Sequence, residues 1–207
     1  MGMKELAQVE VRSVAQWRAW LRRHHAQADS IWLVTFKKEA APAWHVPYDA
    51  IVEEAICFGW VDSQPRALDA QRSMRLLSPR KAGSSWSAKN RQRVEALIAQ
   101  GRMAAPGLAK VDAARRDGSW SRLDSVEILA VPGDLAEALA RNAEAHTNFA
   151  AFPPSTRRAI LEWIQGARQP ATRQRRIADT VEKAAKNIRA NQVRQVVGPR
   201  KSASGQR

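Results

Sequence analysis

The sequence predicts an α+β fold, with a small, mainly antiparallel sheet of about three to four strands and flanking helices in the N-terminal half. An all-helical part is expected to follow. Two observations lead to this prediction. Residues 31–38 and 60–78 carry apolar side chains that alternate or run continuously in short segments, which is typical of strands. After Pro79 they recur every three or four residues, which is typical of helices.

The first elements are a helix, a strand and a second helix. Ser13 can cap a helix over residues 13–27, where apolar residues recur at helical spacing. The run IWLVTFKK over 31–38 predicts a strand covered on both faces. Pro47 can then begin a helix that continues through Cys57, because proline is favoured in the first turn of a helix.

Short strands and then helices come next. Ser85 or Ser87 can cap a helix that Gly101 ends, and a shorter helix is expected over 106–117. The candidate strands before them are residues 60–63, 66–70 and 72–78.

The remainder reads as helical. Asp134 is expected to cap one helix, Pro153 and Pro154 to begin the next, and Thr172 to cap the last. The predicted organisation is an α+β domain over 1–122, a helical region over 123–192 and a flexible basic tail over 193–207.

Charge is unevenly distributed. The chain of 207 residues carries a formal net charge of +14, and residues 151–207 hold 13 Lys and Arg against 3 Asp and Glu. Such a basic end favours an anionic partner such as nucleic acid, an acidic protein or a membrane surface. The alternative is a basic surface without a particular partner. No apolar run reaches the roughly 18 residues of a membrane span, and the start MGMKELAQVEVRS lacks a signal peptide. We therefore expect a cytoplasmic protein.

The cysteine and histidine residues give no indication of a metal site or of cysteine chemistry. Cys57 is the single cysteine, which excludes an internal disulfide and a cysteine-cluster zinc site. The four histidines show no metal-binding spacing. The sequence thus predicts no metal and no cofactor, and it indicates a buried, unreactive thiol.

The residues from 55 to 90 form the main candidate site. Basic side chains at the predicted strand ends and a serine-rich helix start could bind an anion together, and tryptophans at loop positions could line the hollow. The alternative is that Ser85 or Ser87 acts only as a helix cap. The candidate ligand-binding residues are Lys37, Lys38, Trp60, Asp62, Arg80, Lys81, Ser85, Trp86, Ser87 and Asn90.

Asp62 and the arginines of the last predicted helix each have two interpretations. Asp62 could be a general acid or base beside indole rings, or else a turn residue or the partner of an arginine. Arg173, Arg175 and Arg176 lie at a helix start, where positive charge is unfavourable. Either an internal carboxylate such as Glu162 or an external anion could neutralise them.

Several motifs together resemble the YdeI/OmpD-associated family, also described as bacteriocin-protection proteins. They are KK at 37–38, PYDAIVEEAICFGWVDS, SPRK followed by SSWSAKN, GDLAEALARN and TRQRRI. The resemblance spans roughly residues 17–190 and implies an intracellular bacterial α+β protein linked to bacteriocin or stress tolerance. The signature positions that it implies are Trp60, Asp62, Arg80, Ser85, Trp86, Ser87 and Asn90.

The leading functional hypothesis is a non-enzymatic protein that binds an anionic small molecule or an acidic partner. One alternative is nucleic-acid binding through the basic C-terminal helices, and another is an enzyme that uses Asp62. Direct contact with a porin is not expected, because the chain begins without a signal peptide.

Overall fold

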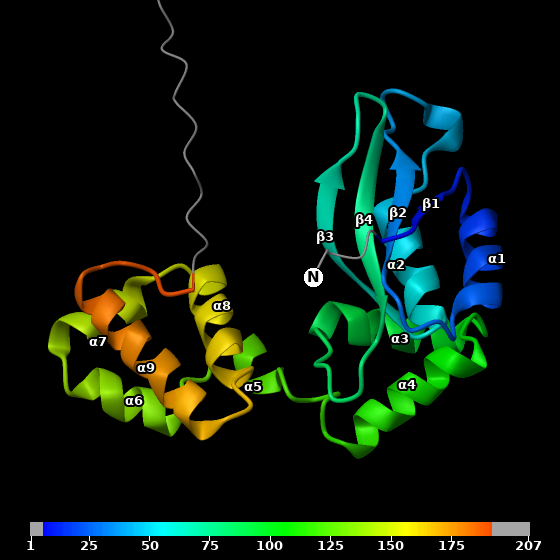
Figure 1. The fold of residues 1–207 in the computed structure, drawn as a ribbon. Coiled ribbons are helices and arrows are strands. Elements are labelled where there is room, and N and C mark those ends of the chain that lie inside the picture. Colours follow the sequence, from blue (N-terminus) through cyan, green and yellow to red (C-terminus); the bar gives the residue numbers. More distant parts are fainter. Residues whose placement is uncertain (1–5, 192–207) are drawn as a thin grey trace, which may run out of the picture. The chain divides into compact units, whose positions relative to one another are not determined.

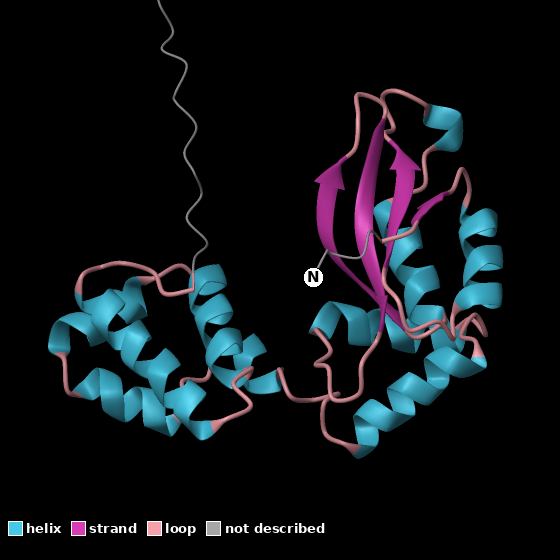
Figure 2. Cartoon of the chain, viewed as in Figure 1, coloured by secondary structure: helices cyan, strands magenta, loops and turns pink. Residues whose placement is uncertain are grey.

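The computed structural model describes residues 6–191. It divides into two compact units, the first ending at Leu123 and the second beginning at Asp124. The first unit contains the sheet, and the second consists of helices (Figures 1 and 2). The predicted tail over 193–207 lies outside the described residues.

The first unit holds a four-stranded mixed sheet, which confirms the α+β prediction. Its strand order is β1-β2-β4-β3, with β1 parallel to β2 and the other two pairings antiparallel. The strands are β1 (Gln8–Glu10), β2 (Ile31–Phe36), β3 (Trp60–Ala67) and β4 (Arg72–Pro79).

Two features of the sheet differ from the sequence prediction. The three-residue β1 was missed, because so short a segment shows no periodicity. The segments 60–63 and 66–70 were expected to be separate strands, but β3 is one strand with a register shift between Asp62 and Pro65. Pro65 has no N–H to donate to the ladder, so an irregularity at an edge strand accommodates it.

The helices of the first unit begin largely where the sequence indicates. The hydroxyl of Ser13 accepts from the backbone N–H of Gln16, and that of Ser87 accepts from Asn90. Ser87, rather than Ser85, is therefore the cap of the third helix. The helical elements are α1 (Val14–His24), the 3-10 turn η1 (Pro42–Trp44), α2 (Tyr48–Cys57), α3 (Ala88–Ala99) and α4 (Ala105–Arg116).

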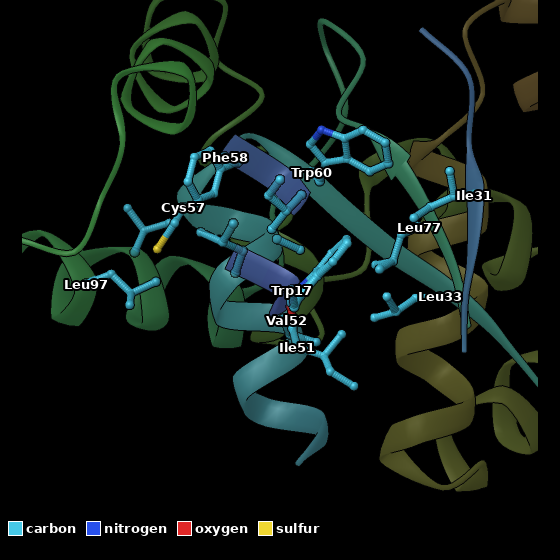
Figure 3. Close-up of a cluster of buried hydrophobic side chains, with 14 of the residues drawn as sticks. Trp17, Ile31, Leu33, Ile51, Val52, Cys57, Phe58, Trp60, Leu77 and Leu97 are labelled. Atoms are coloured by element: carbon cyan, nitrogen blue, oxygen red, sulfur yellow. The ribbon is translucent and has the colours of Figure 1, made fainter. Parts of the chain in front are cut away.

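One hydrophobic core joins the sheet to these helices. Trp17 of α1 packs beside Val52 of α2, with Leu33 and Leu77 of the sheet in the same cluster (Figure 3). The indole N–H of Trp17 is buried and donates to the Ile51 carbonyl at 3.1 Å, so its burial costs no hydrogen bond.

Two glycines allow α4 to pack directly against the end of α2. A Cβ on Gly107 would lie 2.2 Å from the Cys57 carbonyl oxygen. A Cβ on Gly59, whose φ is +76°, would lie 2.8 Å from Cγ of Lys110. This close approach fixes the side chain of Lys110 beside the start of β3.

The second unit contains five helices within the described residues. Asp134 and Thr172 were expected to be N-caps, but the N-caps are Pro132 and Gln169, and both predicted residues lie inside the first turn. The helices are α5 (Asp124–Glu127), α6 (Gly133–Ala140), α7 (Ala143–Ala151), α8 (Pro154–Gln165) and α9 (Pro170–Ala185). In the part of the chain described, no helix is both long and apolar enough to cross a bilayer.

Candidate functional site

The four lysine and arginine side chains predicted at strand ends lie at opposite ends of the sheet. The backbone N–H of Lys37 donates to the Gln71 carbonyl just before β4, whereas Arg80 and Lys81 follow the end of β4. A strand of eight residues spans roughly 25 Å. The expectation that Lys37 and Lys38 share a hollow with Arg80 is therefore wrong, because β2 and β4 are antiparallel.

Lys37 and Lys38 line a hollow of about 420 Å³ together with Tyr48 and His45. We call it the Tyr48 hollow. The ammonium of Lys37 donates to the carbonyls of Asp69 and Ala70, at 2.8 and 3.1 Å. Lys37 thus ties β2 to the hairpin before β4, and most of its donor capacity is already used.

Asp62 is the partner of an arginine and a tyrosine. Its Oδ2 accepts from the Tyr48 hydroxyl at 3.0 Å and from Arg75 at 3.3 Å. The Arg75 guanidinium also lies over the Tyr48 ring, 4.4 Å from its centroid. Burial, and then the neighbouring Asp62 carboxylate, raises the pKa of Tyr48, which keeps its hydroxyl protonated as a donor. Asp62 does not line the Tyr48 hollow.

Trp60 belongs to the core rather than to a ligand site. Its side chain is fully buried, and its indole N–H donates to the carbonyl of His25 at 3.1 Å. The ring also packs edge-to-face on Trp20, with 5.6 Å between centroids. The fully buried ring leaves no exposed surface for the ligand contact that the sequence predicts.

Arg80 is a buried cation without a carboxylate partner among the described residues. The residue is 4% exposed. One terminal nitrogen donates to the Ser85 carbonyl at 3.0 Å, but Nε is buried and has no acceptor. Its guanidinium lies 3.7 Å from the centroid of the Trp86 ring, a stacking contact that stabilises a cation. The indole N–H of Trp86 is also buried without an acceptor.

Burial dominates the electrostatics of Arg80. It lowers the pKa of the guanidinium to about 10, with only a smaller opposing effect from the Asp62 carboxylate. An isolated cation in such a site costs several kcal/mol, and natural proteins normally offset that cost with an acid. Among the described residues, no carboxylate is bonded to Arg80 to offset this cost.

A second, small hollow of about 50 Å³ adjoins the Arg80 side chain. We call it the Arg80 hollow. Lys81, Trp86 and Lys110 line it with Arg80. The backbone N–H of Arg80 donates to the Gly59 carbonyl at 2.9 Å, and Lys110 packs on the same glycine. Gly59 therefore holds the two cations next to each other.

Asp117 also lines the Arg80 hollow, but its carboxylate is bonded to the segment that follows α4. It accepts from the backbone N–H of Ser119 at 2.8 Å. The Ser119 side chain, followed by the Ser119 and Gly83 backbone N–H groups, lowers the pKa of Asp117, so it stays ionised. Arg122 donates to the Gly83 carbonyl at 2.6 Å, which holds the loop that follows β4.

Three predicted residues near the loop are structural in this arrangement. Ser87 caps α3, as the helix-cap alternative proposed, and Ser85 contributes its carbonyl to Arg80. The side-chain oxygen of Asn90 accepts from Arg93 at 3.0 Å. None of the three lines the Arg80 hollow.

Internal acceptors engage two of the three arginines near the start of α9. Arg173 donates to the carboxylate of Asp134 at 2.6 and 2.8 Å, so an internal acid neutralises it, although not the expected Glu162. Arg176 donates to the Trp163 carbonyl and lies over the ring of that residue. Arg175 is exposed.

Sequence reasoning missed Lys110, Asp117 and Tyr48. Nothing in the helical pattern of α4 marks Lys110 as a site residue, because only the glycine contact with the end of α2 brings it to Arg80. The available signal was the pair Gly59 and Gly107, which indicates a close backbone approach. Within the described residues, no group of three or more His, Cys, Asp or Glu side chains could hold a metal ion.

The first unit is thus an α+β domain with a basic hollow at one end of its sheet, and the second is a helical domain. Residues 129–187, within the second unit, match the family model described as "Bacteriocin-protection, YdeI or OmpD-Associated". The chain therefore carries a YdeI/OmpD-associated domain, which confirms the resemblance there.

Residues 9–110 match a second family model, "Domain of unknown function (DUF8412)". The motifs CFGWVDS and SSWSAKN, which contributed to the resemblance, lie within this stretch. No curated protein and no solved structure matches the chain.

Proposed function

We propose that the protein binds an anionic small molecule in the Arg80 hollow. The observation that carries the proposal is a guanidinium that is 4% exposed, has no carboxylate partner among the described residues and leaves Nε without an acceptor. A buried polar group without a partner is unfavourable, and arginine is the residue best suited to bind carboxylate or phosphate. A bound anion would supply the missing acceptor and offset the buried charge.

The surroundings support this assignment over a purely structural role. Lys81 is exposed at the hollow and Lys110 is half-buried beside it, so two further cations attract an anion to Arg80. The family description of residues 129–187 motivates the physiological part of the proposal, a role in bacteriocin or stress tolerance. We propose a non-enzymatic, cytoplasmic protein.

Thermal unfolding in the presence of inorganic phosphate tests the proposal. Phosphate should raise the Tm of the wild type with increasing concentration, since a ligand stabilises the state that it binds, whereas sodium chloride at equal ionic strength should not. Arg80→Gln should remove the effect of phosphate. Lys38→Met, which removes a cation from the Tyr48 hollow, should leave it intact.

A result in which Arg80→Gln folds and responds to phosphate as the wild type does would contradict the proposal. Loss of the response in Lys38→Met alone would move the site to the Tyr48 hollow. Circular dichroism of each variant establishes that it folds.

The two alternative functions receive less support from the side-chain contacts. Of the basic residues on the last helix, Arg173, Lys183 and Lys186 form ion pairs with acids of their own unit. Asp62 is held by Tyr48 and Arg75 and lines neither hollow. Nucleic-acid binding and acid–base catalysis by Asp62 are therefore not part of the proposal.

A further inference from the structure

The charge around the Arg80 hollow exceeds what a single negative charge would neutralise. Three cationic side chains line it, those of Arg80, Lys81 and Lys110, against one carboxylate, that of Asp117. The Asp62 carboxylate acts on Arg80 from β3, but it is bonded to Arg75 and Tyr48. Three cations against one lining acid leave an excess of two positive charges, which favours a dianion over a monoanion.

The size of the hollow limits how much of a ligand it can enclose. Its volume is about 50 Å³, compared with about 420 Å³ for the Tyr48 hollow. We therefore expect it to enclose one small charged group, such as a tetrahedral oxyanion, rather than a whole nucleoside or sugar. Lys81 and Ala82 are exposed at the hollow, so the rest of a larger ligand would extend into solvent there.

The available donors suit an anion with several oxygens. Arg80 offers Nε, and Trp86 offers its indole N–H, both buried and without an acceptor. The ammonium groups of Lys81 and Lys110 add charged donors. A planar carboxylate has two oxygens for these groups, whereas a phosphate ester has three terminal oxygens and carries up to two charges.

We infer that the ligand of the Arg80 hollow is the terminal phosphate of a phosphomonoester, bound as its dianion. The inference rests on the proposed function and adds the class of ligand to it. Because only the phosphate is enclosed, the hollow should discriminate little between phosphomonoesters that differ in the alcohol they carry.

Methyl phosphate and methyl sulfate provide the test, because the two have nearly the same shape and differ by one charge near neutral pH. Titration calorimetry on the full chain at pH 7.5 should give a Kd for methyl phosphate at least about tenfold lower than for methyl sulfate. The second pKa of a phosphate ester is about 6, so near pH 5 only about a tenth of it is dianionic. The preference should then largely disappear.

A double variant tests the role of the excess charge. Lys81→Met with Lys110→Met leaves Arg80 in place and keeps a flexible stem on Gly59. Methyl phosphate should lose its advantage over methyl sulfate in this variant. The control Lys38→Met should keep the advantage, because it alters only the opposite end of the sheet.

The outcomes separate this inference from the proposed function. Equal affinity for both esters, lost in Arg80→Gln, would overturn the phosphomonoester while leaving anion binding at Arg80 intact. A phosphate preference that persists at pH 5 or in the double variant would also overturn the inference. If neither ester binds, both the inference and the proposed function fail.

Discussion

Glu54 and Arg80 are both buried charges in the first unit, and their surroundings differ in one decisive respect. Glu54 is 3% exposed and accepts from Arg18 at 2.6 Å and from Arg102 at 2.9 Å. These bonds connect α1, α2 and the segment after α3. Arg80 has no such partner within the part of the chain that the structure describes. A fully paired buried charge is typical of structure, whereas an unpaired one is typical of a site that a ligand completes.

The two residues should therefore respond differently to loss of charge. Glu54→Gln should lower the free energy of unfolding by about 3 kcal/mol, because two guanidinium groups lose their common carboxylate. Arg80→Gln should change it by less than about 1 kcal/mol, because relief of the buried charge offsets the lost stacking and hydrogen bond. Urea unfolding at pH 7.5 without added phosphate measures both. A larger loss for Arg80→Gln than for Glu54→Gln would mean that Arg80 is structural.

At the residue scale, the role of a side chain can be predicted from the sequence when it depends on residues nearby in the chain. The cap of α3 was narrowed to Ser85 or Ser87, and Arg80 was named as a candidate, since a helix start and a basic loop are local patterns. Trp60 was misjudged because its place after a helix end resembles a loop, although the strand it begins is buried there. Lys110 could not be found, because it reaches Arg80 only through tertiary packing.

Among the elements, α9 shows how a helix start rich in arginine is stabilised. Asp134 in the first turn of α6 accepts two bonds from Arg173 in the first turn of α9. Hydrogen bonding to Arg173 lowers the pKa of Asp134. The carboxylate thus contributes stability above its ordinary pKa of 3.8, and this contribution is lost as the pH falls below that value.

A double-mutant cycle measures this ion pair. Asp134→Asn and Arg173→Gln should show a coupling of about 0.5 kcal/mol at pH 7, because both side chains are partly exposed and solvent screens them. The coupling should decrease as the pH falls below 3.8 and should vanish once the carboxyl group is protonated. The pair Lys186 and Glu182, which is more exposed, provides the comparison. If the cycle gives no coupling at pH 7, the ion pair does not hold Arg173, and this residue would be free to contact an external anion.

Element types were easier to predict than their ends and pairings. The helices that end at Cys57 and begin near Pro154 carry strong local signals, namely proline in the first turn and regular apolar spacing. The helix α7 was missed because its composition is rich in alanine, which gives little apolar contrast. The caps of α6 and α9 were misplaced by a few residues, since helix starts depend on backbone geometry beyond the residue type.

At the scale of the whole molecule, the direction of the strands decides where the site can be. The sequence predicts a mainly antiparallel sheet, but it does not state which strand ends meet. The pairing of β2 with β4 separates Lys37 from Arg80, and the packing of α4 on Gly59 brings Lys110 to Arg80 instead. Long-range pairing of this kind is not contained in local periodicity, so the hollow could be predicted only in part.

The indole N–H resonances of the eight tryptophans test the central claim most directly. The claim is that Arg80 and Trp86 form an anion site, in which the ligand accepts hydrogen bonds from their buried N–H groups. Trp17 and Trp60 donate to backbone carbonyls, whereas Trp86 has no acceptor among the described residues. In a nitrogen–proton correlation spectrum, added methyl phosphate should shift the Trp86 resonance, assigned with Trp86→Phe, and leave those of Trp17 and Trp60 unchanged. A Trp86 resonance that stays in place while methyl phosphate is raised to millimolar concentration would contradict the account.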